Sequence, residues 1–399
     1  MKSARPLPTL VVAAALALGP AISLGLGRFS YALLLPPMRA DLGWSYLTAG
    51  AMNTVNAAGY LAGALAAPMW LRRAGGRASF LAGAAATALG LLAHGAVVGD
   101  TALYALRFLT GVASAATFVA GGVLAAGLVA QPGGAHLARS SGLVLGIYYG
   151  GTGLGIVAAA LVVPALAGRM AAHAWQGAWI ALGVLAGVAA AIAAVATRDL
   201  ALGAAAPNVG PREPFRWRAF APALLAYLLF GLGYIGYMTF VVSLLREERI
   251  GSDVVVAFFI VLGGAVVASS WLWAGVLQRA RGGGALALLN ALLAIATLLP
   301  VLSPRPIVVF ASGLLFGAVF LSLVASTTAL VRHNLAPAAW PAGIATFTIV
   351  FAFGQIVGPS AVGLIADQFG GLRAGFACSA AVLALAALVA VRQKAIGAA

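Results

Sequence analysis

The stretch GLGRFSYALLLPPM, residues 25–38, decides how the chain is organised, because a variant of it returns later in the sequence. Shifted by 206 residues, it lies over GLGYIGYMTFVVSL, residues 231–244, and both glycines and the tyrosine recur. The same shift places RFLTG, residues 107–111, over residues 313–317, with the last glycine in common. A single short match is expected by chance in a glycine-rich chain, but two separate matches at one offset indicate two repeated halves.

The composition is that of a polytopic membrane protein. Hydrophobic residues make up 63% of the chain and charged residues 8%, and the mean hydropathy is +1.06, far above that of a soluble domain. The net charge of +15 does not indicate a nucleic-acid partner, because the arginines punctuate apolar runs and do not gather on a polar face. The single cysteine, Cys378, excludes an intrachain disulfide and a thiolate metal cluster. We expect no metal and no cofactor.

Apolar runs of about 20 residues or more can span a membrane as helices. We therefore predict an all-α fold of twelve transmembrane helices, at residues 9–38, 45–70, 78–98, 101–130, 140–166, 174–196, 219–245, 253–277, 284–302, 305–331, 340–365 and 372–392. The first run resembles a secretory signal peptide, but it continues past the length of one and is interpreted as a retained helix.

One polar segment divides the spans into two groups of six. It predicts an N-terminal bundle over 1–197, a linker over 198–218 and a C-terminal bundle over 219–399. Arg28 and Arg107 lie inside spans, and six of the remaining basic residues fall on one side: Arg39, Arg169, Arg246, Arg249, Arg305 and Arg373. The other fifteen of the 23 fall on the side of both termini, which predicts cytoplasmic termini and a place in the inner membrane.

Several motifs resemble those of the major facilitator superfamily (MFS) of secondary transporters. RFLTG resembles its R-x-x-x-G motif, GIYYGGTGLG (146–155) is similar to its glycine-rich fifth helix, and GQIVGPSAVGLIAD (354–367) to its G-P-x-x-x-G-x-x-x-D pattern. Residues 25–38, NAAGYLAGA (56–64) and WQGAW (175–179) resemble the YbfB-type branch. The resemblance implies two parallel six-helix repeats and alternating access to a central site.

The loop between the second and third spans departs from the family pattern. It reads APMWLRRAGGR (67–77), with Leu71 near the position of the usual acidic partner. The resemblance implies a gating role for Arg72, Arg73 and Arg77, but a mechanism that depends on the missing acid does not transfer to this chain.

Ionisable residues inside spans are costly and are the first candidates for function. All eight acids fall at span ends or in loops, so neither Arg28 nor Arg107 has an acid to pair with inside the membrane. The resemblance implies that helices 1, 4, 7 and 10 line a central cavity, where both guanidinium groups would meet. Because arginine binds carboxylate or phosphate through paired donors, we predict that one or both bind an anionic group of a substrate.

Each arginine also has a structural alternative. Arg107 could instead donate to backbone carbonyls and organise the contact between helices 1 and 4, and Arg28 could do so too. The face that Arg107 shares with Thr110 and Ser114 is polar, whereas the repeat places aromatic residues at the equivalent face of span 10. The predicted substrate-binding residues are Arg28, Tyr31, Asn56, Tyr60, Arg107, Thr110, Ser114, Tyr234, Tyr237, Phe316, Phe320 and Gln355.

The other polar and aromatic residues could instead have structural roles. Phe316 and Phe320 could face lipid or pack between helices, while Asn53 and Asn290 are expected to bridge helices. His94 is the one histidine inside a span and the formal candidate for a proton relay, though a single histidine at a helix end is more typical of a structural role.

The predicted function is secondary transport of a small organic anion, with the substrate and the lipid bilayer as partners and a monomeric state. Two alternatives stay open: efflux of hydrophobic or cationic drugs, and a transport-inactive sensor on the same fold. An enzyme is not expected, because the sequence supplies no metal-ligand or nucleophile constellation and hence no catalytic residue. ATP-driven transport is disfavoured by the lack of a phosphate-binding loop.

Overall fold

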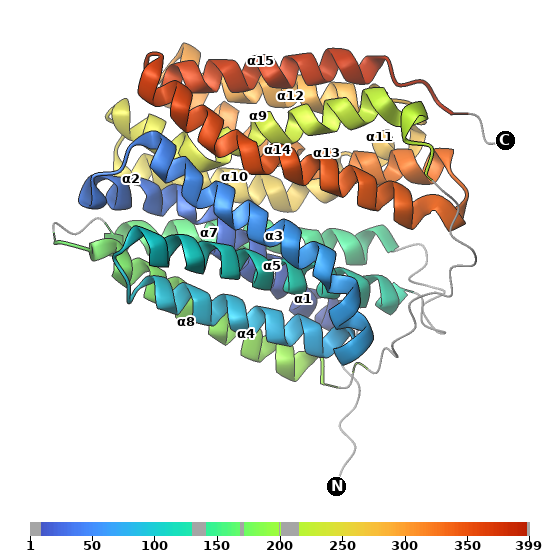
Figure 1. Cartoon of the computed structure of the whole chain (residues 1–399), viewed down its shortest axis with the longest axis horizontal. Helices are drawn as coiled ribbons and strands as arrows, with labels where there is room; N and C mark the ends of the chain where they lie inside the picture. Colours follow the sequence, from blue (N-terminus) through green and yellow to red (C-terminus); the bar gives the residue numbers. More distant parts are fainter. Residues whose placement is uncertain (1–8, 130–140, 168–170, 199, 201–214, 397–399) are drawn as a thin grey trace, which may run out of the picture. The chain divides into compact units, whose positions relative to one another are not determined.

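The computed structural model describes residues 9–129, 141–167, 171–198, 200 and 215–396, and this part is helical with no strand (Figure 1). Each of the twelve predicted spans coincides with one helix or with two or three consecutive helical elements. Eleven of them meet length and hydropathy limits for crossing a membrane among the described residues; the twelfth, α3 (Tyr46–Ala74), is long but more polar. Lys2, Arg5, Arg139, Arg169, Arg212 and most of the predicted linker lie outside the described residues.

The chain forms two compact units, of which the first comprises Met1–Ser30 and Gly59–Ala205. Its core joins α1, α4, α5 and α7 around Leu16, Phe80 and Tyr148, which are fully buried. Apolar side chains drive this packing, since a helix satisfies its own backbone polar groups. Its helices are α1 (Thr9–Pro20), the π-helix η1 (Ala21–Phe29), α4 (Gly76–His94), α5 (Asp100–Val129), α7 (Ser141–Ala167), α8 (Ala174–Ala196) and the later part of α3.

The second unit comprises Tyr31–Ala58 and Ala206–Ala399. In it, α9 packs against α14 and α15, and α12 against α13 and α15 (Figure 1). Its elements are α2 (Tyr31–Leu42), the first part of α3, η2 (Trp217–Phe220), α9 (Ala221–Glu247), α10 (Ser252–Leu272), α11 (Ala274–Arg279), α12 (Gly284–Leu302), α13 (Pro306–Asn334), η3 (Pro337–Ala339), α14 (Trp340–Gln368) and α15 (Gly371–Val391). Residues 31–58 belong by sequence to the first repeat, yet they pack in this unit.

The motif of the eleventh span builds the contact between α14 and the first part of α3. A Cβ on Gly50 would lie 2.4 Å from the Pro359 oxygen, and one on Gly363 would lie 2.4 Å from the Tyr46 oxygen, so only glycine permits this approach. The Asp367 carboxylate then accepts from the backbone N–H groups of Tyr46 at 2.9 Å and Leu47 at 2.8 Å. A carboxylate at this position caps the start of α3 and favourably meets its dipole.

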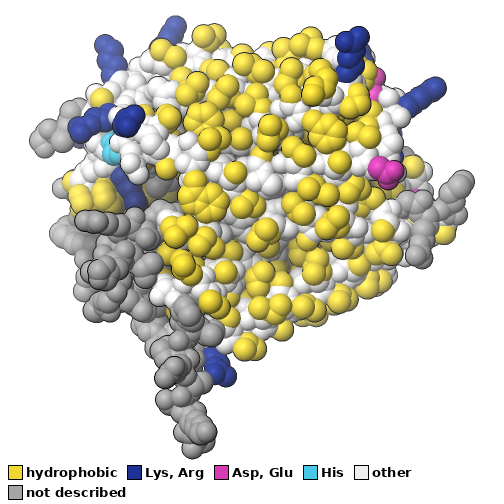
Figure 2. Space-filling view, turned by 180° about the vertical axis from the view of Figure 1, so that it is seen from behind, with side chains coloured by type: hydrophobic (Ala, Val, Ile, Leu, Met, Phe, Trp, Pro, Cys, Tyr) yellow, Lys and Arg dark blue, Asp and Glu magenta, His cyan; other side chains and the backbone are white. Residues whose placement is uncertain are grey.

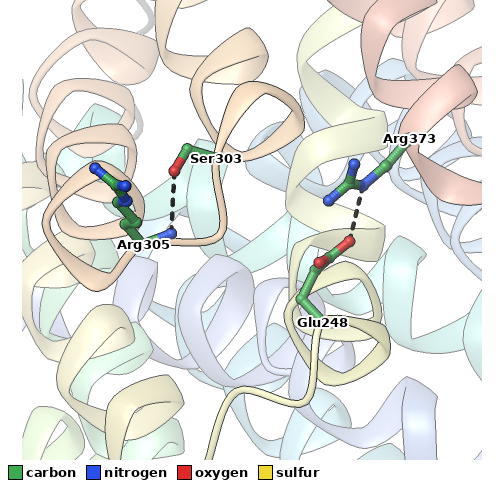
Figure 3. A network of polar contacts seen from close by, with 4 residues as sticks. All are labelled: Glu248, Ser303, Arg305 and Arg373. Carbon is green, nitrogen blue, oxygen red and sulfur yellow. Dashed lines mark hydrogen bonds and ion pairs between the residues drawn. The ribbon is translucent and has the colours of Figure 1, made fainter.

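The charged side chains lie away from the apolar helix surfaces. In Figure 2, hydrophobic side chains cover most of the visible helix surface, and the charged ones lie near its edges. In the second unit, Arg373 of α15 donates through Nε to the Glu248 carboxylate at 2.8 Å, and the Arg305 backbone N–H donates to Ser303 Oγ at 3.3 Å (Figure 3). The Arg373–Glu248 contact joins the end of α9 to the start of α15, two ends that the sequence predicts on the same side of the membrane.

Candidate functional site

Arg28 lies on a π-helix, a rare conformation that is frequent at functional sites. The Ser30 N–H donates to the Gly25 oxygen, five residues earlier, at 3.0 Å. Pro20 immediately precedes η1 and lacks a backbone N–H, which loosens the regular helical ladder there. A Cβ on Gly25 would lie 2.5 Å from Gly155 Cα, so η1 and α7 touch backbone to backbone.

Two nitrogens of the buried Arg28 guanidinium have no polar partner among the described residues. The side chain is 3% exposed, and its Nε and Nη2 atoms have no hydrogen-bond partner among the described residues. Its Cζ atom lies 5.8 Å from the centre of the Tyr60 ring, a cation–π contact that offsets part of the cost of burial. The six acids that the structure describes all lie at or beyond helix ends, and none forms an ion pair with Arg28.

Arg107 adopts the structural arrangement that the sequence left open. Its Nη1 atom donates to the Gly27 oxygen at 3.0 Å, and its Cζ atom lies 5.8 Å from the Trp179 ring. Arg107 therefore ties α5 to η1 one residue before Arg28. A role for Arg107 in direct substrate binding stays a prediction.

Buried hydroxyl groups in the first unit add further polar atoms that are not satisfied internally. Those of Ser23, Thr110, Ser114 and Thr152 have no hydrogen-bond partner among the described residues. Ser114 lies against η1, since a Cβ on Gly27 would be 3.2 Å from Ser114 Oγ. Thr110 instead faces α4, where a Cβ on Gly90 would be 2.6 Å from its hydroxyl. Buried polar groups without partners are uncommon and mark places where a ligand or water can bind.

In the second unit, Tyr234 and Gln355 form a buried pair. Gln355 Nε2 donates to Tyr234 Oη at 2.7 Å, and the two side chains are 5% and 3% exposed, respectively. The Tyr234 ring stacks near those of Phe230 at 4.7 Å, Phe351 at 5.7 Å and Phe320 at 6.0 Å. The repeat places Tyr234 at the position of Arg28. The hydroxyl oxygen of Tyr234 has a hydrogen-bond partner, whereas two nitrogens of Arg28 have none among the described residues.

The other predicted residues of the second unit are engaged in packing. Ser312 donates to the Ala296 oxygen, so Tyr237 Oη donates to Ser312 Oγ, and the Tyr237 ring stacks on Phe316 at 4.0 Å. Phe316 and Phe320 are 0% and 1% exposed, as in the packing alternative. Tyr31 Oη donates to the Ala49 oxygen at 2.8 Å and joins α2 to α3, and Asn56 is buried. Their contact with substrate stays a prediction.

The three arginines assigned to gating have different environments. Arg72 and Arg73 are exposed at the end of α3. Arg77 donates through Nε to the Thr197 oxygen at 2.8 Å and through Nη2 to the Ala194 oxygen at 2.9 Å. Those carbonyls belong to the end of α8, where a cation stabilises the helix dipole. Arg77 thus holds α8 within the first unit, and gating by these residues stays a prediction.

The remaining polar candidates have structural partners, and of the two asparagines expected to bridge helices, Asn53 does so and Asn290 does not. Asn53 Nδ2 donates to Thr239 Oγ1 at 2.7 Å and bridges α3 and α9, whereas Asn290 bonds within its own helix, to the Leu286 oxygen. His94 Nδ1 lies 2.6 Å from the Gly90 oxygen, and its ring stacks on Trp179 at 4.6 Å. No group of metal-binding side chains occurs within the described ranges.

Sequence reasoning missed two aromatic residues beside Tyr60. Phe118 of α5 lies 6.4 Å from the Tyr60 ring, and Tyr149 of α7 lies 5.8 Å from Phe118. The signal was present for Phe118, which follows Ser114 by one helical turn and so shares the face of Arg107. It was weak for Tyr149, because the YY pair at 148–149 does not reveal which tyrosine is buried.

Comparisons with known proteins agree on a family and a fold. The model of a family described as "Uncharacterised MFS-type transporter YbfB" matches residues 20–391. Among solved structures, a point mutant of the nucleoside transporter NupG is similar with a TM-score of 0.71 and 13% identity, covering 95% of this chain and 97% of that one. A bacterial homologue of the human lysosomal transporter Spinster, inward-facing and unoccupied, has a TM-score of 0.71 and 15% identity, covering 96% of each chain. No curated protein matches.

Proposed function

The chain belongs to the YbfB-type family of MFS transporters, and on that premise we propose that it carries a small organic anion whose acidic group binds at Arg28. The family and fold are those of multi-pass secondary transporters and not of enzymes. The transported anion, the inner membrane and the cytoplasmic termini belong to the proposal.

The observation that carries this proposal is the buried guanidinium with unsatisfied donors. Arginine stays protonated in proteins, so it cannot escape the cost of burial by losing its charge. An unpaired charge inside a membrane costs several kcal/mol and is retained where function requires it. A carboxylate or phosphate would satisfy the Nε and Nη2 donors of Arg28 together, because these two atoms form one edge of the guanidinium fork.

The surroundings of Arg28 also favour an anion over a cation. Ser114 of α5 has an unsatisfied hydroxyl that lies against Gly27, the residue before Arg28, and can donate to an oxyanion. A carrier of organic cations would need a carboxylate within the membrane, and the acids that the structure describes lie at helix ends. Arg107 supports the site by holding the Gly27 oxygen and so fixing the π-helical turn that presents Arg28.

Substrate exchange in proteoliposomes tests the proposal without assuming a direction or a coupling ion. We expect Arg28→Ala to lower the affinity for organic anions about 100-fold, since a buried charge loses its partner. Arg28→Lys should recover part of the affinity, because it restores the charge but not the paired donors. Arg305→Ala is the matched control, since only the backbone of Arg305 contacts Ser303 (Figure 3). Near-normal exchange in both Arg28 variants would refute the proposal.

A further inference from the structure

An aromatic cluster in the first unit adjoins the Arg28 guanidinium. Tyr60 of α3 lies under Arg28, Phe118 of α5 lies 6.4 Å from Tyr60, and Tyr149 of α7 lies 5.8 Å from Phe118, each measured between ring centres. Three helices thus bring three rings together in a row that begins at the charge. We call these residues the aromatic row.

The rings of the aromatic row are partly exposed, and the buried Tyr148 packs against them. Tyr149 is 39% exposed, and Tyr60 and Phe118 are half-buried. Beneath them, Tyr148 is fully buried, donates through Oη to the Phe118 oxygen at 2.5 Å and meets the Tyr149 ring edge-on at 5.2 Å. A rigid, partly exposed set of rings can bind a ligand without first ordering itself, which limits the entropic cost of binding.

The aromatic residues that the repeat placed in the second unit differ in this respect. Phe316 and Phe320 are fully buried and contact each other at 5.6 Å, and Tyr237 covers Phe316. Their faces are taken up by other rings of the same unit. Unlike these residues, the row in the first unit has partly exposed rings and lies next to a buried positive charge.

Lipid contact does not account for the end of the aromatic row at Tyr60. Tyr60 lies within cation–π distance of Arg28, and a guanidinium is not stable against hydrocarbon. By contrast, Phe108 of α5 is 38% exposed and forms no ring contact with the row, as expected of a lipid-facing side chain. The two phenylalanines of α5 differ in surroundings, and they provide a matched pair for experiment.

We propose that the aromatic row is a subsite for the ring of an aromatic carboxylate whose acidic group binds Arg28. This inference rests on the proposed function and deepens it by naming the substrate class and the residues that select it. The carboxylate would accept from Nε and Nη2 of Arg28, while the ring packs edge-on or offset against Phe118 and Tyr149.

Two carboxylates of equal charge and similar size test the subsite. Benzoate and cyclohexanecarboxylate would be titrated against the purified full-length protein in detergent, with binding followed by calorimetry. Aromatic contacts add a modest increment beyond buried area, so we expect benzoate to bind about three- to tenfold more tightly. Phe118→Leu or Tyr149→Leu should remove most of that preference while leaving cyclohexanecarboxylate binding nearly unchanged. Phe108→Leu should leave the preference intact.

The outcomes separate the subsite from the anion site. Equal affinities for the two acids in the wild-type protein, or no benzoate binding, would overturn the aromatic subsite even if a variant fails to fold. A benzoate preference that survives both Phe118→Leu and Tyr149→Leu would overturn its location. Loss of binding in Arg28→Ala with no ring preference would leave the anion site standing and refute the subsite alone. Unchanged benzoate binding in Arg28→Ala would refute the proposed function itself.

Discussion

Replacing Arg28 and Arg107 by methionine should change the stability of the ligand-free protein in opposite directions. Arg28 keeps two buried nitrogens without partners, and each unsatisfied polar atom costs about 1–3 kcal/mol. Methionine retains the apolar stem and removes those atoms, so we expect Arg28→Met to stabilise the empty protein by about 2 kcal/mol. This gain is expected because, in the proposed function, a substrate anion and not a protein group pairs with these nitrogens.

Arg107→Met should instead destabilise the protein by about 2 kcal/mol, because its charged hydrogen bond to the Gly27 oxygen is lost and that carbonyl stays buried. Tryptophan-fluorescence melting in detergent measures both effects as shifts of a few degrees. The same samples should show that Arg28→Met no longer gains stability from added organic anion. A melting temperature for empty Arg28→Met at or below that of the wild type would refute the reasoning, since it would mean that Arg28 already has a structural partner.

Two further predictions concern helix contacts. Asp367→Ala should weaken the start of α3 by about 1–2 kcal/mol and speed hydrogen exchange of its first two amides by about tenfold. Asp253→Ala, at an exposed first turn without such bonds, should leave exchange of the corresponding amides unchanged. Equal exchange in both variants would contradict the capping role of Asp367. Gly151→Ala should abolish or sharply lower the folded yield, because its Cβ would fall 1.8 Å from the Ala17 oxygen, whereas Gly187→Ala, with no atom within 4 Å, should fold normally in a size-exclusion assay.

The helices were predictable because each follows from a continuous run of apolar residues in the sequence. A run of apolar residues long enough to cross a bilayer must form a helix, since no other segment satisfies its own backbone there. Every predicted span coincides with helical structure, but the first is divided into α1, η1 and α2, and the eighth into α10 and α11 at Trp273, which does not interrupt the apolar run. The motifs predicted a YbfB-type MFS transporter, and the matching family model confirms that prediction.

The details of the site depend on contacts between helices, which a linear pattern does not carry. The π-helical turn around Arg28 follows from its backbone contact with Gly155 and from the Arg107 bond to Gly27, and both partners lie far away in sequence. The cap on α3 was also not predictable, because the sequence shows Asp367 only as the last residue of a motif and does not show which helix it contacts. Phe118 and Tyr149 were missed because exposure beside a charge is a property of three helices together.

Comparison of the two repeated halves supports the proposal that the ligand binds in the first half. At the position equivalent to Arg28, Tyr234 has its hydroxyl bonded to Gln355 at 2.7 Å and its ring stacked on neighbours in the same unit. The Tyr234 oxygen accepts a hydrogen bond and its ring is covered, while contact of Tyr234 and Gln355 with substrate stays a prediction. Arg28 has the reverse arrangement: a permanent charge, unsatisfied donors and an accessible aromatic row beside it. The two halves therefore differ at this position, because polar atoms of the first half have no partner among the described residues, and the proposed anion would supply one.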